Sequence, residues 1–382
     1  MASRAQGIFR LIYRKPGIDQ WHEAEIMGVS AAKIAVICSF LILGMVLAGL
    51  LMQPKGSLEA WDVKESDFPS KGTSEDKLVF LLNYAILAPS SHNSQPWKFN
   101  LSGNVIRLFA DRSGWLQVAD ADQRELYISL GCALENLLVA AEHFGYSYRV
   151  TYLPENEDSV ASINLIPNGE PSLYPDIAIF QAILTRHTNR LPYQSRPVPE
   201  GAIKTLQNRS AKEGVRIYLI SDSGFKNKFC ELVVSADQIQ YYDVDYRSEL
   251  GHWLGQGMMG PTGIQALIAQ MNVVFLDVGP EQTRNDAELV NSTPVLGFII
   301  SEENDRESQM RAGQAFERLW LAATAMNLSV HPMSQALEVP ETKAKLAELL
   351  PGGYLQQAFR LGFAEFVAKH TPRRPLEEAF AK

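Results

Sequence analysis

Apolar residues recur at intervals of three and four along several long stretches of the chain, a pattern that predicts amphipathic helices. The predicted helices cover 75–87, 122–145 and 308–326, with a further one from about residue 200. Pro89 ends the first helix, because proline has no N–H to donate and its ring clashes with the preceding turn. Asp122 is the expected N-cap of the second helix, with Glu125 three residues later as in a capping box,.

Shorter apolar runs predict strands, which are expected at 98–101, 105–110, 148–153, 215–221 and 295–301,. This mixture of helices and strands indicates the α+β class. The stretch 230–277 is of mixed character, and its part 251–263 holds five glycines, two methionines and a tryptophan. That part is interpreted either as a mobile cover over a site or as a surface loop between two helices.

The helices predicted at 122–145 and 308–326 carry an internal repeat at a fixed offset of 182 residues. Seven of 17 ungapped positions are identical: Gly131, Ala133, Glu135, Leu137, Ala140, Ala141 and Ser147 match Gly313, Ala315, Glu317, Leu319, Ala322, Ala323 and Ser329. Shared core periodicity alone would produce roughly two or three identities, so the repeat predicts a duplication. The chain is therefore expected to hold two similar α+β units.

An uncharged stretch of 19 residues at 34–52 is rich in Ile, Leu, Val, Ala and Gly. About 20 apolar residues span the hydrocarbon core of a bilayer, so this stretch predicts a single membrane-spanning helix. A signal-peptide core is the alternative, but such cores are usually shorter and no small-x-small cleavage site follows. An N-terminal segment, 1–33, precedes the helix and a linker, 53–73, follows it. The globular part is expected on the extracytoplasmic side, although the bias of flanking Lys and Arg is small.

The composition argues against two kinds of partner. The chain of 382 residues has a formal net charge of −8 and a pI near 5.5, which argues against nucleic acid,. The three cysteines, Cys38, Cys132 and Cys230, show no metal-type spacing, and no metal site is expected,.

A stiff polar segment, 88–97, joins the first predicted helix to the first predicted strand. Ser90, Ser91, Asn93 and Gln95 lie in it, followed by Pro96 and Trp97. A carboxamide carries both a donor and an acceptor, which suits the edge of a ring that alternates C=O and N–H groups, as a flavin's pyrimidine edge does. The alternative is an ordinary polar turn between a helix and a strand.

The segment 88–97 resembles the P-S-S-x-N-S-Q-P-W motif of the FMN-dependent nitroreductase superfamily. The resemblance covers 74–380 and is closest to the internally duplicated, Acg-type branch, in which one chain plays both subunits of a dimer. It implies a nitroreductase-like α+β fold and a pseudo-dimer of two fused units, at 74–170 and 171–382. It also implies a monomeric state and FMN as the cofactor.

The same resemblance implies which residues hold FMN. The cluster 186–190 is similar to the R-x-[ST]-x-[RK] motif that binds the phosphate and ribityl oxygens, since a guanidinium can donate two parallel hydrogen bonds to phosphate. A later Arg-Arg pair resembles the family's C-terminal phosphate arginine, although Thr371 stands where many relatives have lysine. Taken alone, a short basic cluster is usually a solvated surface. The implied residues are Arg186, His187, Thr188, Arg190, Arg373 and Arg374.

The helix predicted at 308–326 leads into a loop that passes the flavin N5 atom in the family, so Met333 and Ser334 are further implied cofactor contacts. The nearby His331 is interpreted as a packed structural histidine. No catalytic side chain is assigned, because the flavin itself carries the chemistry.

The implied activity is electron transfer from a small-molecule donor, NAD(P)H or a quinol, to a quinone or nitro-type acceptor. The competing hypothesis is a flavin-binding or flavin-sequestering protein with little turnover, its site covered by 251–263. A structural membrane protein that has lost the cofactor is a third, against which the intact motifs argue. One flavin per chain is expected, because a segment like 88–97 occurs only once.

Overall fold

The computed structural model of the chain describes residues 44, 56–155, 159–167, 176–365 and 369–381. The chain divides into two compact units, Met1–Gln53 and Pro54–Lys382, and all the elements named below belong to the second. The segment 1–33 and the predicted membrane-spanning stretch 34–52 lie outside the described residues, apart from Gly44. Among the described residues, no helix is long and apolar enough to cross a membrane.

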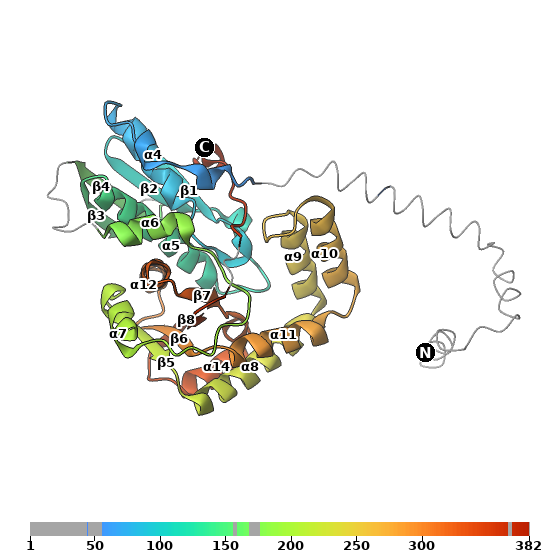
Figure 1. Ribbon diagram of the computed structural model, residues 1–382. Helices are drawn as coiled ribbons and strands as arrows, with labels where there is room; N and C mark the ends of the chain where they lie inside the picture. The colour runs from blue at the N-terminus through green and yellow to red at the C-terminus, as the bar shows by residue number, and fades with distance from the viewer. Residues whose placement is uncertain (1–43, 45–55, 156–158, 168–175, 366–368, 382) are drawn as a thin grey trace, which may run out of the picture. The chain divides into compact units, whose positions relative to one another are not determined.

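The first sheet has four antiparallel strands in the order β1-β2-β4-β3 (Figure 1). They are β1 (Trp97–Ser102), β2 (Val105–Ala110), β3 (Tyr146–Tyr152) and β4 (Ala161–Pro167). Helix α4 (Ser74–Ala85) precedes the sheet and begins at a capping box between Thr73 and Asp76,. Helix α5 (Arg124–His143) connects β2 to β3.

The second sheet repeats this arrangement, with four antiparallel strands in the order β5-β6-β8-β7. They are β5 (Val215–Ile220), β6 (Val295–Ser301), β7 (Ser329–Pro332) and β8 (Tyr354–Gly362). Helix α7 (Glu200–Arg209) precedes the sheet, and α12 (Arg306–Ala325) connects β6 to β7. Both ends of α12 lie 182 positions after the ends of α5, the offset of the sequence repeat. The fold is therefore α+β and fits two fused nitroreductase-like units, as the sequence predicted.

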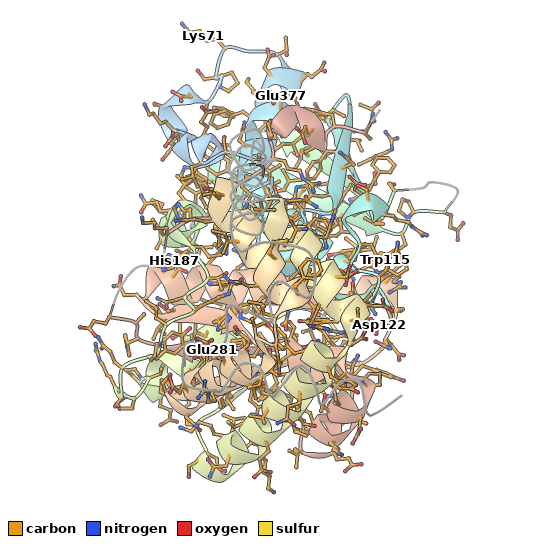
Figure 2. The ribbon with its side chains drawn as sticks, turned by 90° about the vertical axis from the view of Figure 1, so that its right-hand side faces the viewer. Lys71, Trp115, Asp122, His187, Glu281 and Glu377 are labelled. Atoms are coloured by element: carbon orange, nitrogen blue, oxygen red, sulfur yellow. The ribbon has the colours of Figure 1, made fainter. Side chains whose placement is uncertain are left out.

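The second half differs from the first by a helical insertion between its first two strands. The insertion holds α8 (Ser223–Tyr242), α9 (Val244–Gly255), α10 (Gly263–Phe275) and α11 (Gly279–Asn291). Helices α9 and α10 lie side by side at the right of the folded part in Figure 1 and face the viewer in Figure 2. The remaining helices are α6 (Ile177–Thr185), α13 (Gln335–Glu338) and α14 (Pro340–Glu348). The stretch 251–263 thus ends α9 and forms the loop 256–262 before α10.

Helices α5 and α12 cross where each carries a glycine. A Cβ atom on Gly131 would overlap the carbonyl oxygen of Met310, and one on Gly313 would overlap that of Ile128. The two contacts are reciprocal, because Met310 and Gly313 are the repeat partners of Ile128 and Gly131 at the 182-residue offset. Such self-complementary contacts are typical of a two-fold dimer interface, here formed within one chain.

The structure corrects two expectations about elements. The predicted capping box of Asp122 and Glu125 is wrong: the Asp120 carboxylate accepts hydrogen bonds from the backbone N–H groups of Glu125 and Leu126, at 2.8 and 2.9 Å, while Asp122 accepts from Arg124. Strands β4, β7 and β8 were not predicted. In β8 the polar residues Gln356, Gln357 and Arg360 are buried inside the molecule, so its pattern lacks an apolar run.

Because the overlap at the helix crossing is with backbone atoms, which cannot rotate away, we expect Gly131→Ala to separate α5 from α12. Overpacking of this kind costs about 1–3 kcal/mol or more of the free energy of unfolding. Urea unfolding followed by circular dichroism measures the loss. The control is Gly201→Ala in α7, where the added methyl group meets nothing; it should leave stability unchanged or raise it. Equal stability of Gly131→Ala and the wild type would disprove the crossing.

Candidate functional site

The segment between α4 and β1 has an unusual backbone that distant parts of the chain hold in place. His92, Asn93 and Gln95 have φ values of 48°, 52° and 51°, in the left-handed region that non-glycine residues seldom adopt,. The Ser90 hydroxyl accepts from the backbone N–H of Gln95 at 2.9 Å, and the backbone N–H of Ser91 donates to the Ser129 hydroxyl of α5 at 3.3 Å. This segment is therefore rigid.

The two carboxamides of the segment connect it to distant parts of the chain. Asn93 donates to the carbonyl oxygens of Met258, at 2.7 Å, and Pro372, at 2.9 Å. Gln95 is buried and accepts from the backbone N–H of Arg374 at 2.9 Å. Gln95 and Arg374, both predicted cofactor ligands, line a small pocket separate from the two large cavities described next. Their geometry gives them a structural role.

Two adjoining cavities lie beside this segment. The acidic cavity, of about 570 Å³, is bounded by α5, α8, α11 and the stretch from β7 to α13. The basic cavity, of about 620 Å³, is bounded by 186–191, 369–373 and the turn around Trp61. Both are lined by Pro89, Ser90, His92, Thr188, Arg190 and Met259. The two cavities therefore meet at the polar segment and the 186–190 cluster.

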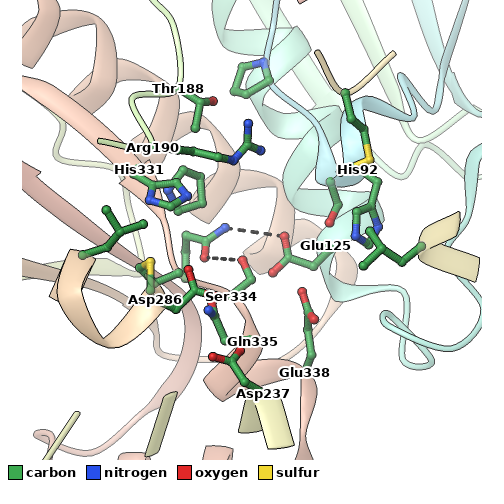
Figure 3. Close-up of a pocket in the computed structure, with 18 of the residues that line it drawn as sticks. His92, Glu125, Thr188, Arg190, Asp237, Asp286, His331, Ser334, Gln335 and Glu338 are labelled. Carbon is green, nitrogen blue, oxygen red and sulfur yellow. Dashed lines mark hydrogen bonds between the residues drawn. The ribbon is translucent and has the colours of Figure 1, made fainter. Parts of the chain in front are cut away.

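Arg190 points into the space between the two cavities (Figure 3). Its guanidinium has no hydrogen bond or ion pair within the part of the chain that the structure describes. Arg190 is exposed to solvent, yet the protein atoms around its guanidinium lower its pKa by desolvation, while the carboxylate of Asp286 acts in the opposite direction. An unpaired guanidinium at a cavity wall can bind an anionic or carbonyl-bearing ligand in a planar, bidentate way.

Arg186 and Arg373 also line the basic cavity, but most of their donors have protein partners. Both are buried, and both donate to the carbonyl oxygen of Leu87, at 2.8 and 2.9 Å. The Nε atom of Arg186 lies 3.3 Å from a carboxylate oxygen of Glu317, whose pKa burial raises to about 7. Arg373 lies over the ring of Trp61, 4.8 Å from its centroid. These two arginines hold the start of the polar segment in place and make the basic cavity positive.

The other predicted site residues lie at the cavity walls. Thr188 pairs with Val330 of β7 and lines both cavities, while His187 lines the basic one. Met333 and Ser334 line the acidic cavity, where the Ser334 hydroxyl donates to Gln357 at 3.1 Å. His331 is buried and accepts from Arg360 at 3.0 Å, and burial holds its pKa well below the usual range. Its neutral, bonded state supports the structural interpretation.

No sequence pattern predicts the carboxylates that line the acidic cavity, because they come from four separate helices. They are Glu125 of α5, Asp237 of α8, Asp286 and Glu288 of α11, and Glu338 of α13 (Figure 3 labels four of them). Burial, followed by the charge of Asp286, raises the pKa of Asp237 to about 8. Burial, followed by the charge of Glu125, raises the pKa of Glu338 to about 8. His92 and Trp61 were also missed, although both adjoin predicted residues.

The site thus joins a positively charged cavity to a polar and acidic one, at the junction of two sheet-bearing halves. An arrangement of this class suits a ligand with an anionic end and a polar ring. No family model matches the chain. A protein of Mycobacterium tuberculosis named as an NAD(P)H nitroreductase, Rv3131, is 31% identical over 312 residues, which cover 78% of this chain and 88% of the relative. The chain belongs to the nitroreductase family.

Two further relatives and one solved structure are similar to the chain. The M. tuberculosis protein acg, also named as an NAD(P)H nitroreductase, is 26% identical over 82% of this chain and 97% of its own length. PigM of a Serratia species is 24% identical over 79% of this chain and 92% of its own. Among solved structures, the FMN-dependent nitroreductase NfnB from Mycobacterium smegmatis in complex with NADPH superimposes with a TM-score of 0.39 at 14% identity, covering 54% of this chain and 98% of NfnB.

The raised pKa values predict how stability depends on pH. In the folded protein without ligand, Asp237 and Glu338 keep their protons up to about pH 8. In the unfolded chain both release them near their ordinary values of 3.8 and 4.5. The folded state therefore binds more protons between these limits, and the free energy of unfolding falls as the pH rises from 5 to 8.

The double variant Asp237→Asn, Glu338→Gln should show a flatter dependence of the melting temperature on pH over this range, measured by calorimetry. The control is Glu348→Gln, an exposed position at the end of α14, which should keep the wild-type profile. A double variant with the wild-type slope would contradict the assignment of these protons.

Proposed function

We propose that this protein is an FMN-dependent oxidoreductase whose cofactor occupies the two adjoining cavities. The observation that carries the proposal is the shared wall of Ser90, Thr188 and Arg190 between a basic and a polar cavity. Each cavity lies in the 300–1,000 Å³ range typical of ligand sites,. Membership of the nitroreductase family and the FMN-dependent character of NfnB support the same cofactor.

The residues present fit FMN. Its phosphate would lie in the basic cavity, near Arg190, His187 and the positive charges of Arg186 and Arg373. Its ring would extend past Ser90 into the cavity lined by Met333 and Ser334. When bound, FMN supplies hydride acceptance and electron transfer. The chain contributes a rigid polar segment, an unpaired guanidinium and walls that limit access by water.

The electron donor is NAD(P)H or a quinol, and the acceptor is a quinone or a nitro compound. The names of the relatives Rv3131, acg and PigM support a nicotinamide donor. If 34–52 anchors the chain with its globular part outside the cytoplasm, we propose a quinol as the donor. The site needs no protein nucleophile for either reaction, in keeping with the absence of an assigned catalytic side chain.

We also propose that the two units arose by duplication and that the monomer holds one flavin. In the first half, the long segment 86–96 connects α4 to β1, and its counterpart between α7 and β5 is only 210–214. The repeat partner of Glu317 is Glu135, which pairs with Lys212 at 2.8 Å and Arg318 at 2.7 Å. Lys212 and Arg318 thus lie near the position that a second site would occupy.

The predicted stoichiometry is one FMN per chain. Protein loaded with excess FMN and desalted should release about one equivalent on denaturation, quantified by absorbance, from a particle of monomer mass. A ratio near two would show that the second half also holds a site and would refute the asymmetry.

Removal of the unpaired guanidinium should weaken cofactor binding. Charge-assisted hydrogen bonds contribute about 1.5–3 kcal/mol, so Arg190→Ala should raise the dissociation constant of FMN roughly ten- to hundredfold, as measured by quenching of flavin fluorescence. Lys204→Ala removes an exposed charge in α7 and serves as the control. An unchanged affinity in Arg190→Ala would contradict the assignment. Arg186→Ala should instead destabilise the fold, because it removes the ion pair with the buried Glu317 and the hydrogen bond to Leu87,.

A flavin-storing protein is the second candidate, and the loop 256–262 favours it. Met258 is fully buried and its carbonyl oxygen is bonded to Asn93. Met259 lines both cavities, and Gly260 and Thr262 line the basic one. The loop is therefore a wall of the site, and it lies where a donor could otherwise approach.

Anaerobic mixing with NADH, NADPH or a soluble quinol distinguishes the two functions. For an oxidoreductase, the absorption band of the oxidised flavin should disappear within seconds. If only dithionite reduces the flavin, and replacement of 256–262 by a short glycine linker restores reduction by a nicotinamide, the protein is a store.

A further inference from the structure

We infer that the carboxylate end of the acidic cavity is a subsite for a cationic group, so that the protein takes substrates bearing a protonated amine or amidine. The inference rests on the proposed function for the identity of the reaction, but the subsite itself rests on the geometry of the carboxylates. None of the residues that form it belongs to the predicted FMN motifs.

Asp237 is the centre of the subsite. Only 2% of the residue is exposed, it lines the cavity, and its Oδ2 atom has no hydrogen-bond partner among the described residues, although the Gln335 side chain lies close enough to lower the pKa of Asp237. A buried acceptor without a partner is destabilising, and a ligand N–H would satisfy it. Figure 3 shows Asp237 on the same side of the cavity as Gln335 and Glu338. The Oδ2 atom of Asp237 is therefore placed to accept a hydrogen bond from a ligand.

The neighbours of Asp237 make the same end of the cavity acidic. Asp286 and Glu338 both raise the pKa of Asp237 through their charges, so the three carboxyl groups lie within electrostatic range of one another. Glu338 accepts a hydrogen bond from Gln240 at 2.6 Å, and Asp286 accepts one from Gln282 at 3.0 Å. These partners are neutral amides, which orient the carboxyl groups and supply no positive charge. Asp237 and Glu338 therefore keep their protons at neutral pH until a cation binds beside them.

The protein cations near the cavity act on the neighbours of Asp237: Arg190 and Arg360 lower the pKa of Asp286, and Arg124 lowers that of Glu338. The interactions that shift the pKa of Asp237 itself come from Asp286, Gln335 and Glu338. The charged and titratable groups that face this end are Asp120, Arg124 and Glu125 at α5, Asp237 and Tyr241 of α8, Tyr246 of α9, Asp286 of α11, Arg190, His331, Glu338 and Arg360. Arg124 pairs with Glu125 at 2.8 Å, and Arg360 donates to His331 and backbone carbonyls. Arg190 remains, at the boundary with the basic cavity. An organic cation would displace the protons of Asp237 and Glu338 and pair with the carboxylates that result.

The chemistry of the acceptor also limits the ligand. Oδ2 needs an N–H donor, so a primary ammonium or an amidinium fits and a quaternary ammonium does not. Tyr241 and Tyr246 line the same end, where aromatic faces favour an organic cation over a hydrated metal ion,. In agreement, the described residues hold no group of side chains suited to a metal ion. An anionic substrate would oppose the ionisation of these carboxyl groups and gain no ion pair, so it is disfavoured at this end.

A matched series of nitro compounds tests the inference. The series is 4-nitrobenzylamine, 4-nitrobenzyl alcohol and 4-nitrobenzoate, which share a ring and a reducible group and differ in charge. For the flavin-loaded protein, kcat/KM should be about ten- to hundredfold higher for the ammonium compound than for the alcohol, and lowest for the benzoate. Asp237→Asn should lower the amine-to-alcohol ratio about tenfold. Glu281→Gln, an exposed position on α11, should keep it.

Calorimetry separates this inference from the proposed function. Phenethylamine carries an ammonium group and cannot be reduced, so its binding can be measured whether or not the protein turns over. Binding at pH 7 should release protons, seen as a heat that varies with the buffer, because the cation lowers the pKa of Asp237 and Glu338. Asp286→Asn should weaken this binding and is a second variant should Asp237→Asn fold poorly. Binding of phenethylamine without turnover of the nitro compounds would refute the enzymatic function and support the subsite. Turnover with equal rates for amine and alcohol, or no binding of phenethylamine, would overturn the subsite.

Discussion

The close approach of two helix backbones is the constraint on which the rest of this molecule depends. Helices α5 and α12 can cross at Gly131 and Gly313 only because neither position has a side chain. Each helix serves its own sheet and also contributes to the cavity wall, α5 through Ser129 and α12 through Trp320. The geometry of the site is therefore set by the helix crossing. A substitution that changed the distance between the two helices would displace both sheets and the cavity wall together.

A second constraint fixes the polar segment after α4. The carbonyl oxygen of Leu87, at the start of this segment, accepts hydrogen bonds from Arg186 and Arg373, which lie 99 and 286 residues further along the chain. The left-handed residues that follow are held through Asn93 and Gln95, which bond to Met258, Pro372 and Arg374. These hydrogen bonds offset the energy of the unusual backbone. The C-terminal segment thus belongs to the site, although it forms only a short helical turn, Leu376–Ala379, of its own.

Periodicity in the sequence was enough to predict the long elements. Strands β2 and β6 and helices α5 and α12 are found within about two residues of their predicted limits, because their apolar spacing is regular and their interiors are buried. Strand β8 was missed, since buried Gln356, Gln357 and Arg360 break its apolar pattern and only tertiary partners explain them. The duplication signal predicted a two-unit fold, which the strand orders fit.

The site was predictable where one short segment carries several of its residues, as in 186–190. It was not predictable where function comes from packing, as with the carboxylates that four helices bring together around Asp237. Motif residues also make contacts that the sequence does not predict: Gln95, a predicted cofactor ligand, accepts a hydrogen bond from the backbone N–H of Arg374 and lines a small pocket apart from the two large cavities. A motif predicts where a residue lies, and the contacts of that residue determine its role.

The fusion of the two halves has a consequence for how the site responds to dilution. In a homodimer whose site needs both subunits, lowering the protein concentration separates the halves and releases the ligand. Here the crossing at Gly131 and Gly313 is intramolecular, so the halves meet at an effective concentration that dilution cannot change. A protein kept at a few copies per cell would retain its site. The halves are also free to diverge, as the insertion of α8 to α11 in only one of them illustrates.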